Sequence, residues 1–211
     1  MPQLPAGAFE DLNTTAYHAT ASNGDRPTPE ATLDRRIAIV GSFSTGKTTL
    51  AERLSREMDL PLLPETAREV VELGFKLDKD ATPETECLIF LKQYNNELSF
   101  SEFVGDRSLV DVMAYAGWVL DNQPRRKETA LWEECKRLAE RHVRSAYSHV
   151  VYLPIEFPIV LDGLRPDDPA FQKEIDERIL HLLWSHDVAY DTVRGSVEER
   201  LEQIRALLGT S

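Results

Sequence analysis

GSFSTGKTTL, residues 41–50, fits the pattern G-x-x-x-x-G-K-[ST], in which backbone N–H groups surround a phosphate. In this pattern the lysine, here Lys47, reaches the outer phosphates, and the next hydroxyl, here Thr48, binds Mg²⁺. The candidate nucleotide-binding residues are Gly41, Ser44, Thr45, Gly46, Lys47, Thr48 and Thr49. The loop therefore predicts that the protein binds ATP together with Mg²⁺.

The flanking residues supply the structural context that this loop needs. Residues 35–40 form a short apolar run after a charged start, which predicts a buried parallel strand. After the loop, Leu50, Leu54 and Met58 recur at helical spacing. A phosphate in the loop would then sit at a helix N-terminus, where unpaired N–H groups favour an anion. The order strand, loop, helix argues against a coincidental turn.

The length and composition indicate one α/β domain preceded by an extension. The chain has 211 residues, which suits a single domain. Residues 1–34 carry prolines without an apolar period, which predicts a disordered extension, and residues 35–211 form the predicted domain. The extension resembles neither a secretory signal nor a transit peptide, and no stretch has the ~18 apolar residues of a membrane span. With only two cysteines, the sequence predicts a cytoplasmic protein.

The charge limits the classes of partner. The formal net charge is −12 and the pI is about 4.9. Binding of duplex DNA is disfavoured, because it requires a basic surface. A nucleotide or another small molecule remains compatible with this charge. The sequence leaves the oligomeric state open.

Strand and helix patterns alternate along the rest of the chain. Further strands are predicted at 60–63, 103–106, 149–153 and 188–193. Helices are predicted at 65–74, from 82 onward with a stripe of Cys87, Leu91, Tyr94 and Leu98, and at 109–120, 131–142, 171–182 and 197–208. Cys87, Cys135 and His142 lie on apolar stripes, which predicts core packing. The pattern predicts a P-loop NTPase fold: a three-layer sandwich with a five-stranded parallel sheet, helices on both faces and a small lid.

Charged residues follow several of the predicted strands. In parallel sheets, function gathers at the carboxyl ends of the strands. Asp106 follows the third strand and is the candidate Mg²⁺ ligand together with Thr48. Glu65 follows the second strand and could orient or deprotonate a hydroxyl acceptor; alternatively, it only caps a helix. Arg165, in a glycine-containing loop, could close over the transferring phosphate; alternatively, it pairs with Asp167 or Asp168.

Four stretches together carry a resemblance to a known family. IAIVGSFSTGKTTLAERL, PETARE, GDRS and LDGLRPDD…FQKEIDERI resemble the P-loop kinase domain of NadR-type ribosylnicotinamide kinases, an AAA-like group, over most of residues 35–208. Asp-Arg-Ser at 106–108 is also similar to thymidylate kinases and, with Asp for Glu, to deoxyribonucleoside kinases. The ribosylnicotinamide kinases carry aromatic residues beside the Glu after the second strand, where this chain has Pro64 and Thr66.

The resemblance implies roles for individual residues. Glu65 would act as the base, and Arg107 would reach the substrate or the phosphates. The predicted catalytic set is Lys47, Glu65, Asp106, Arg107 and Arg165, and the predicted acceptor-binding set is Glu65, Arg68 and Arg107.

Three functional hypotheses follow. The first is an ATP- and Mg²⁺-dependent kinase whose acceptor is a nucleoside or nucleotide. The second is a kinase that acts on a hydroxymethyl pyrimidine within DNA, which the acidic composition disfavours. The third is a nucleotide-binding switch without a small acceptor. The guanine-reading motif N/T-K-x-D is missing from the sequence, which weakens the switch hypothesis.

Overall fold

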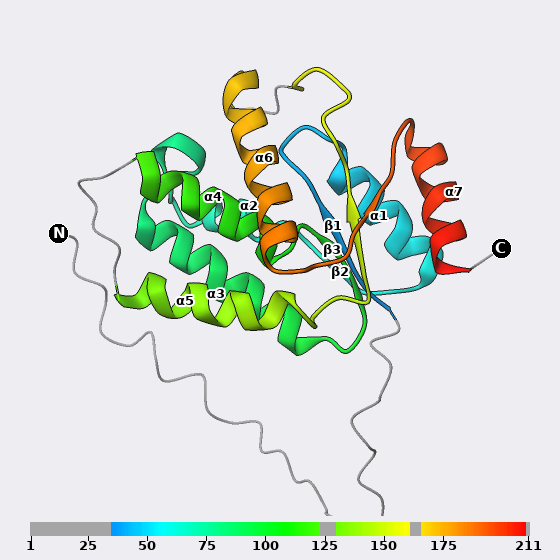
Figure 1. Cartoon of the computed structure of the whole chain (residues 1–211), viewed down its shortest axis with the longest axis horizontal. Coiled ribbons are helices and arrows are strands. Elements are labelled where there is room, and N and C mark those ends of the chain that lie inside the picture. Colours follow the sequence, from blue (N-terminus) through cyan, green and yellow to red (C-terminus); the bar gives the residue numbers. More distant parts are fainter. Residues whose placement is uncertain (1–34, 123–129, 161–165, 210–211) are drawn as a thin grey trace, which may run out of the picture. The chain divides into compact units, whose positions relative to one another are not determined.

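A five-stranded parallel sheet forms the centre of the fold (Figure 1). The computed structural model describes residues 35–122, 130–160 and 166–209. The strands are β1 (Arg36–Val40), β2 (Leu62–Leu63), β3 (Phe103–Asp106), β4 (His149–Tyr152) and β5 (Asp191–Thr192), in the order β2-β3-β1-β4-β5. All four strand pairs are parallel, which confirms the predicted sheet. The predicted extension at 1–34 lies outside the described residues.

Helices cover both faces of the sheet. They are α1 (Lys47–Met58), α2 (Thr66–Glu72), the 3₁₀ helix η1 (Asp78–Asp80), α3 (Pro83–Ser99), α4 (Leu109–Asn122), α5 (Ala130–Val143), α6 (Pro169–Ser185) and α7 (Val197–Leu208). In β1, Ile37 and Ile39 pack toward α1 and α7, whereas Ala38 and Val40 pack toward α3 to α6. These two groups of helices lie on opposite sides of the sheet (Figure 1). This alternation follows from the two-residue period of a strand. The predicted three-layer sandwich is confirmed.

The central strand brings the predicted site together. β1 is flanked by β3 and β4, so the chain leaves β1 toward one side of the sheet and returns on the other. Such a reversal of strand order opens a crevice at the carboxyl ends of the strands. Ile39 lies in register with Asp106, so the phosphate loop after β1 and the acidic residue that ends β3 are neighbours.

Helix α3 begins as predicted but turns a different face to the core. The Thr82 hydroxyl accepts a hydrogen bond from the N–H of Thr85, with Pro83 in the first turn. The predicted stripe is wrong at Leu91 and Leu98, which are 46% and 59% exposed. The inward positions are instead Glu86, Ile89, Phe90, Gln93 and Glu97. Of the polar groups on this face, Gln93 and Glu97 have hydrogen-bond partners inside the protein.

Glu97 shows how those partners are supplied. Its carboxylate oxygen Oε2 lies 2.7 Å from the hydroxyl of Tyr147 and 2.8 Å from Nε2 of His142. Satisfied hydrogen bonds remove most of the cost of burying a carboxylate. His142 therefore packs as predicted but also serves this network. Cys87 and Cys135 are buried free thiols, as predicted.

The peripheral strands are shorter than predicted. β2 contains only two residues because Pro61 has no N–H, although its carbonyl still accepts from Val104 N at 2.9 Å. The two residues of the edge strand β5 are exposed, whereas Val193 beside them is buried. Within the described part of the chain, no helix has the length and apolarity needed to cross a membrane. The cytoplasmic location stays a prediction.

Candidate active site

The phosphate loop opens onto a cleft at the N-terminus of α1. Gly46 is the N-cap of α1 with φ 89°, and no side chain caps this helix end. The first-turn N–H groups are thus available to an anion. The cleft has a volume of about 380 Å³. Five of the seven predicted nucleotide-binding residues line it: Ser44, Gly46, Lys47, Thr48 and Thr49.

The other two predicted loop residues, Gly41 and Thr45, do not line the cleft. Gly41 has φ +146°, and a Cβ there would lie 2.5 Å from the carbonyl oxygen of Leu153. Only glycine permits this close approach of the loop to the end of β4. The buried Thr45 hydroxyl donates to the carbonyl of Ser42 at 2.9 Å. In the structure both residues shape the loop.

Lys47 lies folded against the loop from which it projects. Its side chain is almost fully buried, and its ammonium contacts the Ser42 carbonyl and lies 3.3 Å from the Thr45 hydroxyl. Because Lys47 also lines the cleft, its charge is placed beside the phosphate position. A lysine at this position acts as a point charge on phosphate oxygens.

Thr48 and Asp106 meet where the metal was predicted. The Thr48 hydroxyl donates to Oδ2 of Asp106 at 2.7 Å. The other carboxylate oxygen of Asp106, Oδ1, is buried and has no hydrogen bond to any described residue. Hydroxyl and carboxylate oxygens are ligands that Mg²⁺ prefers, and Mg²⁺ uses few protein ligands alongside substrate phosphates. This pair therefore fits a Mg²⁺ ion shared with a nucleotide.

Glu65 lies between two arginines at the edge of the cleft. Its Oε1 accepts from Nε of Arg107 at 2.7 Å, and its Oε2 accepts from Nε of Arg68 at 3.1 Å. Both arginines line the cleft. Glu65 is the N-cap residue of α2, yet its side chain makes no capping hydrogen bond. The geometry thus differs from that of a helix cap, and it brings Glu65, Arg68 and Arg107 together beside the phosphate loop.

The backbone of Arg107 adopts a rare conformation. Its φ is +86°, a region that residues other than glycine seldom occupy. Such conformations cost of order 1–3 kcal/mol and concentrate at functional sites. The side chain is buried, and its Nη1 makes no hydrogen bond within the described ranges, although it lies 3.8 Å from Asp111 Oδ1.

Asp111 is a functional residue that sequence reasoning missed. It is fully buried, accepts from the N–H of Gly41 at 3.2 Å and from the N–H of Ser108 at 2.9 Å, and so ties the phosphate loop to α4. Burial raises the pKa of Asp111, against the opposing charges of Arg107 and Lys47. A signal was present, because Ser108-x-x-Asp111 resembles the [ST]-x-x-[DE] helix-start pattern.

A second, smaller cavity lies on the other side of Glu65. We call it the acidic pocket; its volume is about 30 Å³, and its polar lining consists mainly of Glu65, Asp78, Glu86, Asp111, Arg107 and Tyr115. Arg107 lines both the cleft and the acidic pocket. No sequence motif marks Asp78, Glu86 or Tyr115 as residues of a site.

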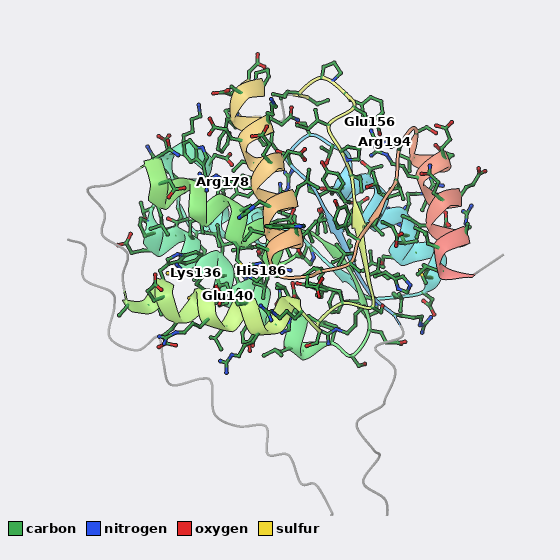
Figure 2. All side chains as sticks on the ribbon, viewed as in Figure 1. Lys136, Glu140, Glu156, Arg178, His186 and Arg194 are labelled. Atoms are coloured by element: carbon green, nitrogen blue, oxygen red, sulfur yellow. The ribbon has the colours of Figure 1, made fainter. Side chains whose placement is uncertain are left out.

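Arg200 of α7 holds the phosphate loop by a hydrogen bond to its backbone. Its guanidinium is buried and donates from Nη1 to the Thr45 carbonyl at 2.6 Å and from Nη2 to Glu156 at 2.8 Å. Figure 2 labels Glu156 and Arg194, which lie beside each other with Oε1 and Nη1 3.7 Å apart. Burial of Glu156 raises its pKa, but Arg200, the N–H of Gly195 and Arg194 together outweigh this and the net pKa is lowered. Sequence reasoning missed Arg200, for which no pattern exists.

The predicted lid, with Arg165, lies outside the described residues. Of the two aspartates proposed as its partners, Asp168 has other contacts. It accepts from the N–H of Phe171 at 2.9 Å as the N-cap of α6, and it contacts the ammonium of Lys79. The role of Arg165 stays a prediction.

The sheet order, the glycine-bracketed loop and the Thr48–Asp106 pair define a P-loop nucleotide-binding domain. The chain belongs to the family described as "AAA domain", which matches residues 36–200. No curated protein matches the sequence.

Solved structures share the fold. A NadR protein in complex with NAD and AMP-PNP superposes with a TM-score of 0.64 at 17% identity, covering 85% of this chain and 51% of that chain. This chain thus spans about half the length of the NadR protein. Deoxyadenosine kinase from M. mycoides with dCMP and dCDP superposes with a TM-score of 0.58 at 12% identity. The match covers 83% of this chain and 98% of the kinase. Shikimate kinase from Acinetobacter baumannii with shikimate superposes with a TM-score of 0.50 at 14% identity. The match covers 84% of this chain and 94% of the kinase.

Proposed function

We propose that the protein is an ATP- and Mg²⁺-dependent kinase that phosphorylates a hydroxyl group of a small acceptor, a nucleoside or a nucleotide. The observation that carries this proposal is the position of Arg107, which lines both the phosphate cleft and the acidic pocket and is held by Glu65. A nucleotide switch needs the cleft but not a second pocket with a carboxylate at the junction. The similar folds of enzymes described as kinases agree with this proposal.

The cleft would hold the triphosphate of ATP. Backbone N–H groups at the start of α1 surround the phosphates, and Lys47, Arg68 and Arg107 supply positive charge around the transferring group. Phosphoryl transfer depends mainly on such positioning and charge, since the transition state spreads charge over the phosphoryl oxygens. Thr48 and Asp106 would hold Mg²⁺, which when bound neutralises developing charge on the phosphates.

Glu65 would act on the acceptor. Its carboxylate is held by Arg68 and Arg107 at the junction of the cleft and the acidic pocket. An acceptor hydroxyl placed there would give its proton to Glu65 while its oxygen forms a bond to the γ-phosphorus. The bond between that phosphorus and the bridging oxygen breaks, and ADP leaves.

ADP release with and without candidate acceptors tests the proposal. A kinase releases ADP faster when its acceptor is present, and the phosphorylated acceptor accumulates in equal amount. We expect this stimulation with at least one member of a panel of nucleosides and nucleotides. Slow hydrolysis of ATP that no acceptor alters would favour the switch, and stimulation only by DNA that contains hydroxymethyl pyrimidine would favour the second hypothesis.

A further inference from the structure

Acidic residues outnumber basic ones in the lining of the acidic pocket. The pocket lies between α2, η1, α3 and α4, and four carboxyl groups line it: Glu65, Asp78, Glu86 and Asp111. Among the described residues of its lining, Arg107 is the one cation. Like charges so close together repel, and a low-dielectric surrounding strengthens the repulsion. The lining is therefore a poor environment for an added anion.

Arg107 is already committed to carboxylates of the protein. Its Nε lies 2.7 Å from Oε1 of Glu65, and its Nη1 lies 3.8 Å from Oδ1 of Asp111. A phosphate or carboxylate group in the pocket would have to compete with both. An anionic acceptor would thus compete with Asp111 and Glu65 for Arg107, and weakening the charge compensation of a buried carboxylate is costly.

Two other polar groups of the pocket, the Tyr115 hydroxyl and the Glu86 carboxyl, are buried beside Arg107. The Tyr115 residue is 8% exposed, and its hydroxyl makes no hydrogen bond with any residue that the structure describes, although the Arg107 guanidinium lies over its ring at 5.3 Å. Glu86 is 3% exposed, and burial together with the nearby Asp78 raises its pKa to about 8. A neutral carboxyl group both donates and accepts hydrogen bonds. Buried polar groups without partners are rare, so a ligand is the natural partner here.

The size of the pocket limits what can enter it. A volume of about 30 Å³ is enough for roughly two or three waters, at roughly 10–15 Å³ per water. The neighbouring cleft is more than ten times larger, at about 380 Å³. Only a small end group of an acceptor fits the pocket, while its reacting hydroxyl remains beside Glu65.

We propose that the acidic pocket selects an unphosphorylated, uncharged or cationic acceptor and that Glu86 and Tyr115 bind the hydrogen-bonding end group of that acceptor. The inference rests on the proposed kinase function and narrows it. Nucleosides satisfy this requirement, whereas nucleoside monophosphates and carboxylate-bearing acceptors do not. Glu86 and Tyr115 thereby determine specificity without touching the transferring phosphate.

Matched pairs of acceptors test the charge selection. The pairs are adenosine and AMP, cytidine and CMP, thymidine and its 5′-monophosphate, and glycerol and glycerol 3-phosphate. We expect the best acceptor to be unphosphorylated, with a kcat/KM about 100-fold or more above that of its phosphorylated partner, because the latter brings charge into a carboxylate-lined cavity. A phosphorylated acceptor that reacts better than its unphosphorylated partner overturns the inference but leaves the kinase function standing. Failure of every acceptor, with ATP binding intact, counts against the kinase function itself.

Two conservative variants test the residue assignments. Glu86→Gln and Tyr115→Phe should each raise the KM for the acceptor about tenfold, the usual consequence of one lost buried hydrogen bond. The kcat and the KM for ATP should stay within threefold of the wild type. The matched controls Glu84→Gln and Tyr94→Phe, outside the pocket lining, should change neither KM. Unchanged acceptor KM in both pocket variants, with normal circular dichroism, overturns the assignment.

Discussion

The phosphate cleft and the acidic pocket share Arg107 but recognise their ligands in opposite ways. The cleft is formed largely by one short segment, residues 44 and 46–49, and offers backbone N–H groups and positive side chains. The acidic pocket draws on four separate helices and offers carboxyl and hydroxyl groups. A phosphate can be bound by the backbone of a short loop, whereas an acceptor must be recognised by side chains. The phosphate cleft can therefore be found as a sequence motif, whereas the acidic pocket cannot.

Arg107 also lies where the sign of the surrounding charge changes. On one side of it lie Lys47 and Arg68, and on the other lie the carboxyl groups of Asp78 and Glu86. A triphosphate therefore belongs in the cleft and is repelled from the pocket. Substitutions at one region should leave ligand binding at the other nearly unchanged, and this separation can be tested.

The largest expected effect comes from Glu65→Gln. We expect kcat to fall by about 10²–10⁴-fold, because the acceptor hydroxyl loses its proton acceptor. Affinity for ATP should persist, since glutamine can still accept a hydrogen bond from Arg107. Steady-state kinetics and calorimetry with an ATP analogue measure the two quantities, and Glu69→Gln on the same helix is the control. A lower melting temperature with normal turnover would show that Glu65 matters only for folding.

A somewhat smaller loss is expected for Lys47→Ala. Removing a charge aimed at the transferring phosphate costs about 3–4 kcal/mol of transition-state stabilisation, or roughly 10²–10³ in kcat. The exposed Lys173→Ala, whose side chain is 74% exposed, is the control and should behave as wild type. Retention of activity within a few-fold of wild type would contradict the assignment of the phosphate loop.

Asp106→Asn should weaken Mg²⁺ binding. One negative ligand of a hard cation is lost, so we expect the Mg²⁺ concentration for half-saturation to rise roughly tenfold. Titration of Mg²⁺ into the complex with a non-hydrolysable ATP analogue measures this by calorimetry, independently of turnover. The control is Asp121→Asn, at the end of α4, where the carboxylate pairs with Arg178. Equal Mg²⁺ affinity in variant and wild type would remove Asp106 from the metal site.

The smallest expected effect is a pH-dependent gain in stability from Glu86→Gln. The unfolded chain releases the Glu86 proton near pH 4.5, whereas the folded protein retains it to about pH 8. Between these values the folded state binds more protons, so the wild type loses stability as pH rises. Glutamine avoids this loss, and the variant should gain at least about 1 kcal/mol at pH 8 and much less at pH 5. Melting curves at both pH values measure this gain, with Glu84→Gln as the control.

The fold was predictable because each element carries a local signal. The loop, its preceding strand and the start of α3 at Thr82-Pro83 all follow from short-range rules. The buried face of α3 could not be predicted, because it depends on partners that are distant in the sequence. Glu97 is buried because His142 and Tyr147 form hydrogen bonds with it. Apolar periodicity counts Leu91 as buried and has no means of detecting such a network.

The candidate site likewise contains residues that could be predicted from the sequence and residues that could not. Asp106 ends a predicted strand, and Lys47 and Thr48 end the phosphate loop that follows the neighbouring strand, so their meeting follows from the parallel sheet. Tyr115 in α4 and Arg200 in the first turn of α7 reach the site from positions that no motif marks. Their contribution depends on how those helices are rotated and packed, which one sequence does not reveal.

The contact between Arg200 and Thr45 has a consequence for how the protein is made. The two residues are 155 positions apart, so the loop emerges from the ribosome long before the helix that secures its carbonyl. Contacts of such long sequence separation form late, after loop-closure entropy has been overcome. A nascent chain that ends before α7 would carry the complete glycine-rich motif without its finished geometry. Nucleotide binding should therefore begin only after α7 has been synthesised and has packed against the loop.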